Sequence, residues 1–427
     1  MKKTFIFFFL TILIGCNYAN KEIEPKENEP NEYSKALDIV HEFIKRIEPL
    51  HSKSSDFHDL QIINAEKKTT QIKFTHRINQ LSQNAISAID LREYIDIYTF
   101  SFEKNGKQGF TIVTDDARIP SVLAYIEDGD LSDTINNPAA AFVFRNLRKI
   151  LINDLNRYYS EKLSPQNFTK SKIFTTWQLG PTIKTQWSTN KSPYNDNYPF
   201  PQSGGALCPS TDNKKYPASG TAIALSQCII CYPSDPVFQL DLPTSLTTNY
   251  NVREFAKTKQ IAPNSTHAKK VAEFIKKIDE ATGTEFSCSG TKTELRLANY
   301  GLSNLGFPSN YYLYHSNARP AKYIEYIVKA LKFDCASVLG GYDNKLRKYV
   351  VWIIDGINGQ VADDYSDYSD DLFVHCNFSN GGKNDGWVKN FMAPKDHYGN
   401  FILGDDYSFS LEGIHIRPVS PYIDPEF

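Results

Sequence analysis

The part of the chain that follows residue 33 switches between helical and strand spacing of its apolar side chains. Apolar residues recur every three to four positions over 36–47, which predicts an amphipathic helix. Residues 95–102 instead alternate, with Tyr98, Phe100 and Phe102 on one face, which predicts a strand. The remaining predicted elements are strands over 108–116 and 119–125 and a helix over 139–159. We therefore expect a hairpin-rich sheet covered by helices in this region.

The second half is organised around one segment that is apolar on nearly every side. Residues 218–232 are rich in small and apolar side chains and are bracketed by Pro217 and Pro233, which is typical of a helix at the centre of a domain. The further predicted elements are helices over 268–278 and 320–332 and strands over 348–354 and 372–377. The polar stretch 164–172 separates the two halves and is the expected domain boundary.

The first residues have the pattern of an export signal. Lys2 and Lys3 precede the apolar run 5–14, which is too short to span a hydrocarbon core of about 30 Å and predicts a signal peptide. The run ends in LIGC, which is similar to a bacterial lipobox, so residues 1–16 are expected to be a lipoprotein signal with Cys16 lipidated. An ordinary secretory signal or an uncleaved anchor is the alternative. Residues 17–34 predict an acidic tether, which favours display at the outer membrane or the cell surface.

Composition narrows the class of protein further. Of the 427 residues, 41% are hydrophobic and 22% are charged, which is typical of a globular protein and excludes a fibrous or low-complexity chain. The 47 Lys and Arg against 49 Asp and Glu give a net charge of −2, so no basic field predicts nucleic-acid binding. The 7 cysteines are too few for a disulfide scaffold. The length predicts two domains, over 35–165 and 173–427.

Short motifs follow one another in a fixed order along both halves. Residues 108–118 read QGFTIVTDDAR and residues 120–125 read PSVLAY. Residues 186–187 read QW, residues 352–356 read WIIDG and residues 375–377 read HCN. This order resembles the streptopain family of secreted bacterial cysteine peptidases. The resemblance implies an α+β fold, in which a papain-like domain is preceded by a small inhibitory α+β prodomain with an antiparallel sheet.

The resemblance also implies a catalytic site whose reactive residues are replaced in this chain. Cysteine peptidase chemistry needs a thiolate at a helix start, a histidine that pairs with it and an oxyanion donor. The family's cysteine position holds Gly220, its histidine position holds Val350, and its oxyanion glutamine position holds Thr189. The orienting asparagine is retained as Asn377, and Phe378 follows it in place of the family's tryptophan.

These replacements predict a pseudopeptidase. Loss of a nucleophile or its base costs on the order of 10⁶ in rate in a comparable triad enzyme, so peptidase activity is not expected. The expected role is binding or regulation, with a peptide or protein ligand such as a related active peptidase. We expect no cofactor, no metal ion and no nucleic acid as partners, and contact with the membrane only through the lipid on Cys16. The prodomain is expected to stay attached through residues 160–175.

Two other classes of function are supported by particular residues. A hydrolase with a relocated nucleophile would use Ser219, with His375 as a replacement base, although a serine at a helix start is most often an N-cap. An adhesin or glycan-binding lipoprotein on the same fold is the second alternative, because a fold does not determine a function. The acidic loop over 363–371 lacks the ligand pattern of a calcium loop and is interpreted as solvated.

The cysteines leave one question open. Cys228 and Cys231 have the Cys-x-x-Cys spacing of redox and zinc sites, but no second cysteine or histidine pair accompanies them. Buried thiols are the simpler interpretation, and a disulfide in an oxidising compartment is the alternative. Its candidate members, besides these two, are Cys208, Cys288, Cys335 and Cys376.

Overall fold

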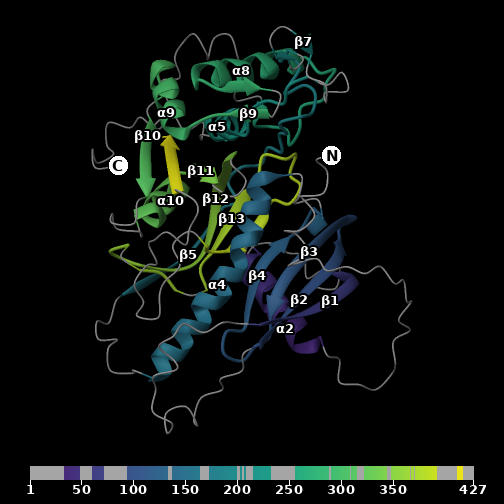
Figure 1. Cartoon of the computed structure of the whole chain (residues 1–427), viewed down its shortest axis with the longest axis vertical. Helices are drawn as coiled ribbons and strands as arrows, with labels where there is room; N and C mark the ends of the chain where they lie inside the picture. Colours follow the sequence, from purple (N-terminus) through teal and green to yellow (C-terminus); the bar gives the residue numbers. More distant parts are fainter. Residues whose placement is uncertain are drawn as a thin grey trace.

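The fold was derived from a computed structural model of the whole chain (Figure 1). It describes residues 33–48, 60–71, 94–132, 137–163, 173–199, 202–203, 206–207, 215–231, 255–287, 290–307, 309–314, 322–343, 348–365, 367–369, 371–391 and 411–416. The signal and lipobox with Cys16, nearly all of the tether, the boundary 164–172, Cys208 and Cys288 lie outside these residues. Within them, no helix has both the length and the apolar character needed to cross a membrane.

The described part of the N-terminal half is a four-stranded antiparallel meander with two helices. Its elements are α2 (Ser34–Ile47), β1 (Gln61–Gln71), β2 (Tyr94–Lys104), β3 (Lys107–Thr114), β4 (Ser121–Ile126) and α4 (Pro138–Leu163). The helix predicted over 36–47 and the strands predicted over 95–125 are confirmed. The turn between β2 and β3 forms at Asn105 and Gly106, which have positive φ angles of 54° and 71°, as a tight hairpin turn requires. β1 was not predicted, because its side chains are largely exposed and polar.

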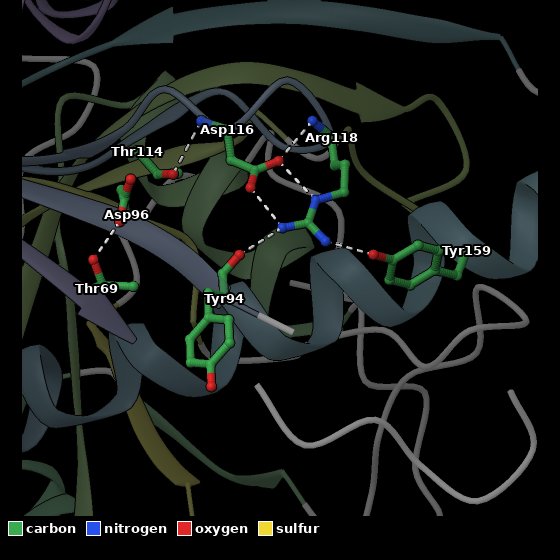
Figure 2. Close-up of polar contacts among 7 residues, drawn as sticks. All are labelled: Thr69, Tyr94, Asp96, Thr114, Asp116, Arg118 and Tyr159. Carbon is green, nitrogen blue, oxygen red and sulfur yellow. Dashed lines mark hydrogen bonds and ion pairs between the residues drawn. The ribbon is translucent and has the colours of Figure 1, made fainter. Parts of the chain in front are cut away.

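A buried ion pair fastens α4 to this sheet (Figure 2). The Arg118 guanidinium lies 2.6 Å from Asp116 Oδ2, and both side chains are under 5% exposed. Arg118 also donates to the hydroxyl of Tyr159 on α4 and to the carbonyl oxygen of Tyr94 on β2. Because a buried charge must be paired and hydrogen-bonded, these contacts hold the loop after β3, strand β2 and helix α4 together. This is the structural role of the DDAR end of the first motif.

The second half surrounds the predicted apolar helix, α5 (Gly220–Cys231), with strands and further helices. These are α8 (Ala268–Ala281), α9 (Leu295–Asn304) and α10 (Lys322–Lys332), the strands β5 (Phe174–Leu179), β10 (Ser309–Tyr314), β11 (Ser337–Asp343), β12 (Lys348–Ala362), β13 (Phe373–Asn377), β14 (Gly386–Lys389) and β15 (Leu411–Ile416), and the short hairpins β6 (Gln202–Ser203)–β7 (Ala206–Leu207) and β8 (Glu285–Ser287)–β9 (Gly290–Lys292). Residues 221–230 of α5 are all buried, as the all-round apolar pattern predicted.

One sheet runs through both halves. Its order is β1-β2-β3-β4-β14-β13-β12-β11-β15-β10, with β5 paired to β12, and every pairing is antiparallel. The two halves join where β4 pairs with β14, with Tyr125 opposite Trp387. Figure 1 shows β1–β4 beside α4 and continuing toward β13 and β12. The expected fold class, α+β with an antiparallel sheet, is confirmed.

The hydrophobic core is also shared between the halves. Phe142 on α4 stacks on Trp352 of β12, with ring centroids 5.7 Å apart, and Phe144 lies 6.3 Å from Phe378. One contiguous buried cluster contains residues of β2–β4, α4, α10 and β11–β14. α4 is therefore part of the core against which the second half packs.

The structure corrects the predicted end of one strand. The sequence predicted a strand over 348–354 that ends before Asp355-Gly356. β12 instead continues to Ala362 through a β-bulge between Ile354 and Gly356. Gly356 is needed at this point, since a Cβ there would lie 2.9 Å from the Cβ of His375 on the neighbouring strand. Local turn propensity was overridden by pairing with β13 and β5.

Candidate functional site

A cleft of about 720 Å³ lies where the starts of α4 and α5 meet β12 and the β8–β9 hairpin. Its lining includes Thr189, Gly220 and Val350, three of the four positions that the sequence analysis assigned to the degenerate catalytic site. The fourth, Asn377, immediately precedes the lining residue Phe378. The fold therefore brings the sequence-predicted positions together at one cleft.

The start of α5 is capped by a serine rather than by a reactive thiol. The Ser219 hydroxyl accepts a hydrogen bond from the backbone N–H of Ala222 at 2.9 Å, which is the geometry of an N-cap. The same hydroxyl donates to Asp279 Oδ1 at 2.7 Å. Ser219 is only 2% exposed. The Thr284 hydroxyl also donates to the Ser219 hydroxyl at 3.5 Å, which is thus held by three partners and faces a carboxylate instead of an imidazole.

Asp279 was not recognised from the sequence, although it organises this end of the cleft. It lies on α8, is fully buried, and accepts hydrogen bonds from Ser219, Thr284 and the Tyr198 hydroxyl. Burial, reinforced by the nearby charge of Asp279, raises the pKa of Tyr198. The signal that was available is a carboxylate at helical spacing on the apolar face of α8, four residues after Ile275.

Gly220 leaves space where a nucleophile would stand. A Cβ built on Gly220 meets no other atom within 4 Å, so the position is open toward the cleft. A helix start carries the positive end of the helix dipole, which stabilises a thiolate. The position has the room and the dipole for a reactive group, but glycine supplies none.

At residue 350, which the sequence analysis assigned to the catalytic base, the side chain is hydrocarbon. Val350 lies on β12 opposite Gly341 of β11, is 2% exposed and belongs to the shared core. Valine has no proton acceptor, so no group at this position can take a proton from residue 220 or its neighbours.

The loop that contains Thr189 is fixed by α5. Gln227 accepts from the backbone N–H of Trp187 at 3.0 Å and from the Thr185 hydroxyl at 3.2 Å. The Thr189 carbonyl oxygen accepts from the Ala218 N–H at 2.7 Å. These bonds place the loop beside the start of α5, as an oxyanion donor would require. Threonine here is shorter than the glutamine that the resemblance implies.

The N-terminal half also contributes to the cleft, through the start of α4. Asn137 caps this helix, because its Oδ1 accepts from the N–H groups of Ala139 and Ala140 at 3.0 and 3.1 Å. Its Nδ2 donates to the Phe378 carbonyl oxygen at 3.2 Å. Asn137, Pro138 and Ala139 all line the cleft. Asn followed by Pro is a recognisable helix-start signal, but the sequence did not show that this helix points at the site.

Asn377 and His375 both face groups other than a catalytic pair. Asn377 Oδ1 accepts from the backbone N–H of Ser379 at 2.9 Å. His375 Nδ1 lies 2.6 Å from Asp355 Oδ1, and its ring packs edge-on against Trp387. Burial alone would lower the pKa of His375, but the charge of Asp355 and its hydrogen bond raise the pKa above the usual value. His375 is not among the residues that line the cleft.

A serine–histidine contact occurs elsewhere in the described residues. Ser337 Oγ lies 2.8 Å from His415 Nδ1 between β11 and β15. Both residues are buried, and neither lines the cleft. Burial lowers the pKa of His415 to about 3, so the ring stays neutral. The pair is enclosed in the protein, where a substrate cannot reach it.

The described cysteines are thiols that form no disulfide with one another. Cys228, Cys335 and Cys376 are buried, and Cys231 is partly buried. Burial raises the pKa of Cys231 to about 12 and that of Cys228 well above its usual value, so neither is a ready nucleophile. Within the residues that the structure describes, no group of three or more His, Cys, Asp or Glu side chains is arranged to hold a metal ion. In the acidic loop, Asp371 pairs with Arg46 of α2 at 2.7 Å.

Comparison with known protein families gives one match. Residues 187–388 match the sequence profile of the Peptidase C10 family, which is the streptopain family. The resemblance to the streptopain family is confirmed. The matched segment begins at Trp187, just before the loop that contains Thr189, and ends in β14.

A search of solved structures matched that of active wild-type interpain A, a cysteine protease of Prevotella intermedia. The match has 17% sequence identity and a TM-score of 0.39, and it covers 57% of this chain and 95% of the interpain A chain. No curated protein matches the sequence.

Proposed function

We propose that this protein is a lipid-anchored pseudopeptidase, which binds a peptide or protein segment in the cleft of a cysteine peptidase fold without cleaving it. The observation that supports this most directly is the pair Gly220 and Val350. Both line the cleft, at the start of α5 and on β12, and neither side chain can donate or accept a proton. A peptidase needs both functions at these two positions.

The cleft keeps features that suit ligand binding. Thr189, Thr291 and Asn380 line it with hydroxyl and amide groups, which hydrogen-bond peptide groups, and Phe286 and Tyr349 add aromatic surface. The short β8–β9 hairpin forms one wall, and Glu285 and Lys292 there bring charges of both signs. A cleft that has no reactive groups but has polar groups and volume is suited to bind a peptide without cleaving it.

Hydrolysis assays on the full chain test this proposal. We expect no turnover of a casein substrate and no stoichiometric modification by a thiol-directed active-site label. The matched control is Ser219→Ala, because Ser219 directly precedes the open position at Gly220 and lines the cleft. Turnover by the wild-type protein that is lost in Ser219→Ala would establish a hydrolase with a relocated nucleophile instead.

Binding has to be shown separately, since inactivity alone does not establish a ligand. We expect casein-derived peptides to bind the full chain with micromolar affinity, measured by fluorescence anisotropy. A side chain that fills the open position, as in Gly220→Phe, should weaken this binding, whereas Ser303→Ala on the distant α9 should leave it unchanged. Equal binding by wild type and Gly220→Phe would contradict a ligand in the cleft.

The anchoring part of the proposal rests on the sequence pattern at Cys16. The protein is proposed to sit at the outer membrane or cell surface through lipid on this residue. Intact-mass analysis of protein extracted from membranes should show the mass of a diacylated chain that begins at Cys16. Cys16→Ser should release the protein from the membrane fraction. An unmodified secreted chain would contradict the anchor.

A further inference from the structure

A second pocket shares no described lining residue with the cleft, although its lining begins at Arg296, three positions after the cleft residue Thr293. It has a volume of about 420 Å³ and lies between α9 and β10, with Arg296, Asn299, Tyr300, Ser309 and Tyr311 in its walls. Figure 1 shows α9 and β10 together at the end of the sheet that is remote from β1–β4. This pocket has no part in the proposed function of the cleft.

Two polar atoms in the walls of this pocket have no hydrogen-bond partner. Asn299 Oδ1 and the Ser309 hydroxyl are both buried and unpaired, and Ser309 as a whole is 9% exposed. Native proteins rarely leave buried polar atoms unsatisfied, because each loses its hydrogen bonds to water. Next to a pocket, such atoms indicate a polar ligand that completes their hydrogen bonding.

The charge of the pocket is positive. Among the described residues of the lining, Arg296 is the one charged side chain, and it is exposed. Two nearby carboxylates have other partners, since Glu294 lies 3.4 Å from Lys292 and Glu412 accepts a hydrogen bond from Tyr311, although Glu412 also interacts with the charge of Arg296. A guanidinium beside unpaired polar atoms favours a carboxylate, which it binds with two parallel hydrogen bonds.

The shape of the site favours an extended peptide. β10 is the last strand in the described order of the sheet, next to β15. It reads SNYYLY and contains no charged residue, whereas β1 at the opposite end contains Glu66, Lys67 and Lys68. Charged residues on an edge strand oppose the addition of another strand, and β10 lacks that protection. Tyr300, 61% exposed on α9, provides an aromatic surface beside the same edge.

We propose that the edge of β10 and the pocket beside it bind an extended peptide segment of another protein, which adds to the sheet as a strand and places an acidic side chain against Arg296. Main-chain hydrogen bonds to β10 supply affinity, and the pocket selects the side chain. The pocket is separate from the cleft, so a ligand in one leaves the other accessible.

Synthetic peptides and the full chain test this proposal. The probe is the capped peptide Thr-Val-Thr-Glu-Thr-Val-Thr, compared with the same peptide in which Gln replaces Glu. We expect the Glu peptide to bind about tenfold more tightly than the Gln peptide, because a charge-assisted pair is lost. Arg296→Gln should remove that difference, and Tyr300→Ala should weaken both peptides.

Two controls separate strand addition from other modes of binding. Leu297→Ala changes an exposed residue of the same helix that does not line the pocket, and it should bind like wild type. N-methylation of alternate residues of the Glu peptide keeps its side chains but removes main-chain donors, and it should abolish binding. Equal binding of the Glu and Gln peptides, no binding of either, or binding that survives N-methylation would overturn the proposal. So would an oligosaccharide that binds wild type and not Tyr300→Ala, since the site would then recognise a glycan.

Discussion

Lys389 Nζ lies 2.6 Å from Asp154 Oδ2, and both side chains are almost entirely buried. Asp154 lies on α4 in the N-terminal half, and Lys389 ends β14 in the second half. The ion pair therefore crosses the expected boundary between prodomain and peptidase-like domain. Together with the pairing of β4 and β14, it makes the two halves parts of one folded unit.

Breaking this pair should destabilise the whole chain. Lys389→Met leaves the Asp154 carboxylate buried without its cation, which costs about 3–5 kcal/mol of unfolding free energy. The double variant Asp154→Leu/Lys389→Met removes both charges and should recover most of the loss, because neither charge is then stranded. Urea unfolding followed by circular dichroism measures both. If Lys389→Met has the same unfolding free energy as wild type, the ion pair does not contribute to stability.

The shared core also predicts that cutting the chain between the halves does not separate them. A site-specific protease sequence inserted between Ser164 and Lys172 would allow such a cut. We expect both fragments to elute together from a sizing column, because Phe142 and Phe144 of α4 pack on Trp352 and Phe378 of the second half. The uninserted chain treated with the same protease is the control. Two separately eluting folded fragments would contradict a shared core.

The sequence predicted the helices and strands whose burial is one-sided or complete, and missed the partners across the fold. The all-round apolar pattern located α5, and the register of the motifs placed Gly220 and Val350 at one cleft. The one-sided helical spacing over 139–159 located α4 over most of its length. That α4 serves both halves was not predictable, because the partners of its apolar residues lie about 200 residues away in the chain.

The missed polar residues have the same physical explanation. In the sequence, Asp279 looks like an ordinary polar residue of a helix. Only the fold brings Tyr198 and Ser219 next to it, where both donate hydrogen bonds to its carboxylate. β10 and β15 are short, and their pairing with each other joins segments about 100 residues apart. Local spacing contains no information about such pairing, whereas it does determine the capping role of Ser219.

Asp385 and His375, two ionisable residues near the pairing of β4 with β14, predict that the free energy of unfolding depends on pH. Burial raises the pKa of Asp385 to about 7, although the Phe378 N–H and the charge of His375 act in the opposite direction. A carboxyl whose folded pKa is raised binds its proton more tightly in the native state. Its contribution to stability is therefore complete below the unfolded pKa near 4 and is lost as the pH rises toward 7. The pKa of His375 is also raised, so its contribution to stability is likewise lost as the pH rises above the usual pKa of histidine.

Asp385→Asn should remove the Asp385 part of this dependence. Asparagine keeps the oxygen that accepts from Phe378 N–H at 2.7 Å but does not ionise. We expect wild type to lose roughly 1 kcal/mol per pH unit relative to the variant between about pH 4 and 7. Denaturant unfolding at pH 5 and pH 8 measures the difference. Parallel pH profiles for wild type and Asp385→Asn would contradict the raised pKa.

Ser219→Ala should act on stability alone if the hydroxyl is a helix cap. It removes the bond to the Ala222 N–H and one donor to Asp279, so we expect a loss of about 1 kcal/mol in unfolding free energy. Ser219→Thr keeps a hydroxyl and should lose less. Thermal unfolding of the three proteins measures the order. A destabilisation as large in Ser219→Thr as in Ser219→Ala would argue that packing, and not the cap, accounts for the effect.

The open position at residue 220 predicts that a thiol placed there becomes reactive. A Cβ at this position meets no atom within 4 Å, so Gly220→Cys should fold normally. The start of α5 lowers the pKa of a thiol, and the new cysteine should react with iodoacetamide at pH 6.5 several-fold faster than a free thiol. The rate is taken after subtracting that of wild type, since buried cysteines such as Cys228 react slowly.

The matched control places a thiol at the opposite end of a helix. Ser303 is exposed near the C-terminus of α9, so Ser303→Cys meets the negative end of a helix dipole and should react more slowly than a free thiol. Adding Val350→His to Gly220→Cys should raise the rate further, because an imidazole across the cleft favours the thiolate. If Gly220→Cys reacts no faster than Ser303→Cys, the start of α5 does not activate residue 220, and the cleft has lost more than its two reactive side chains.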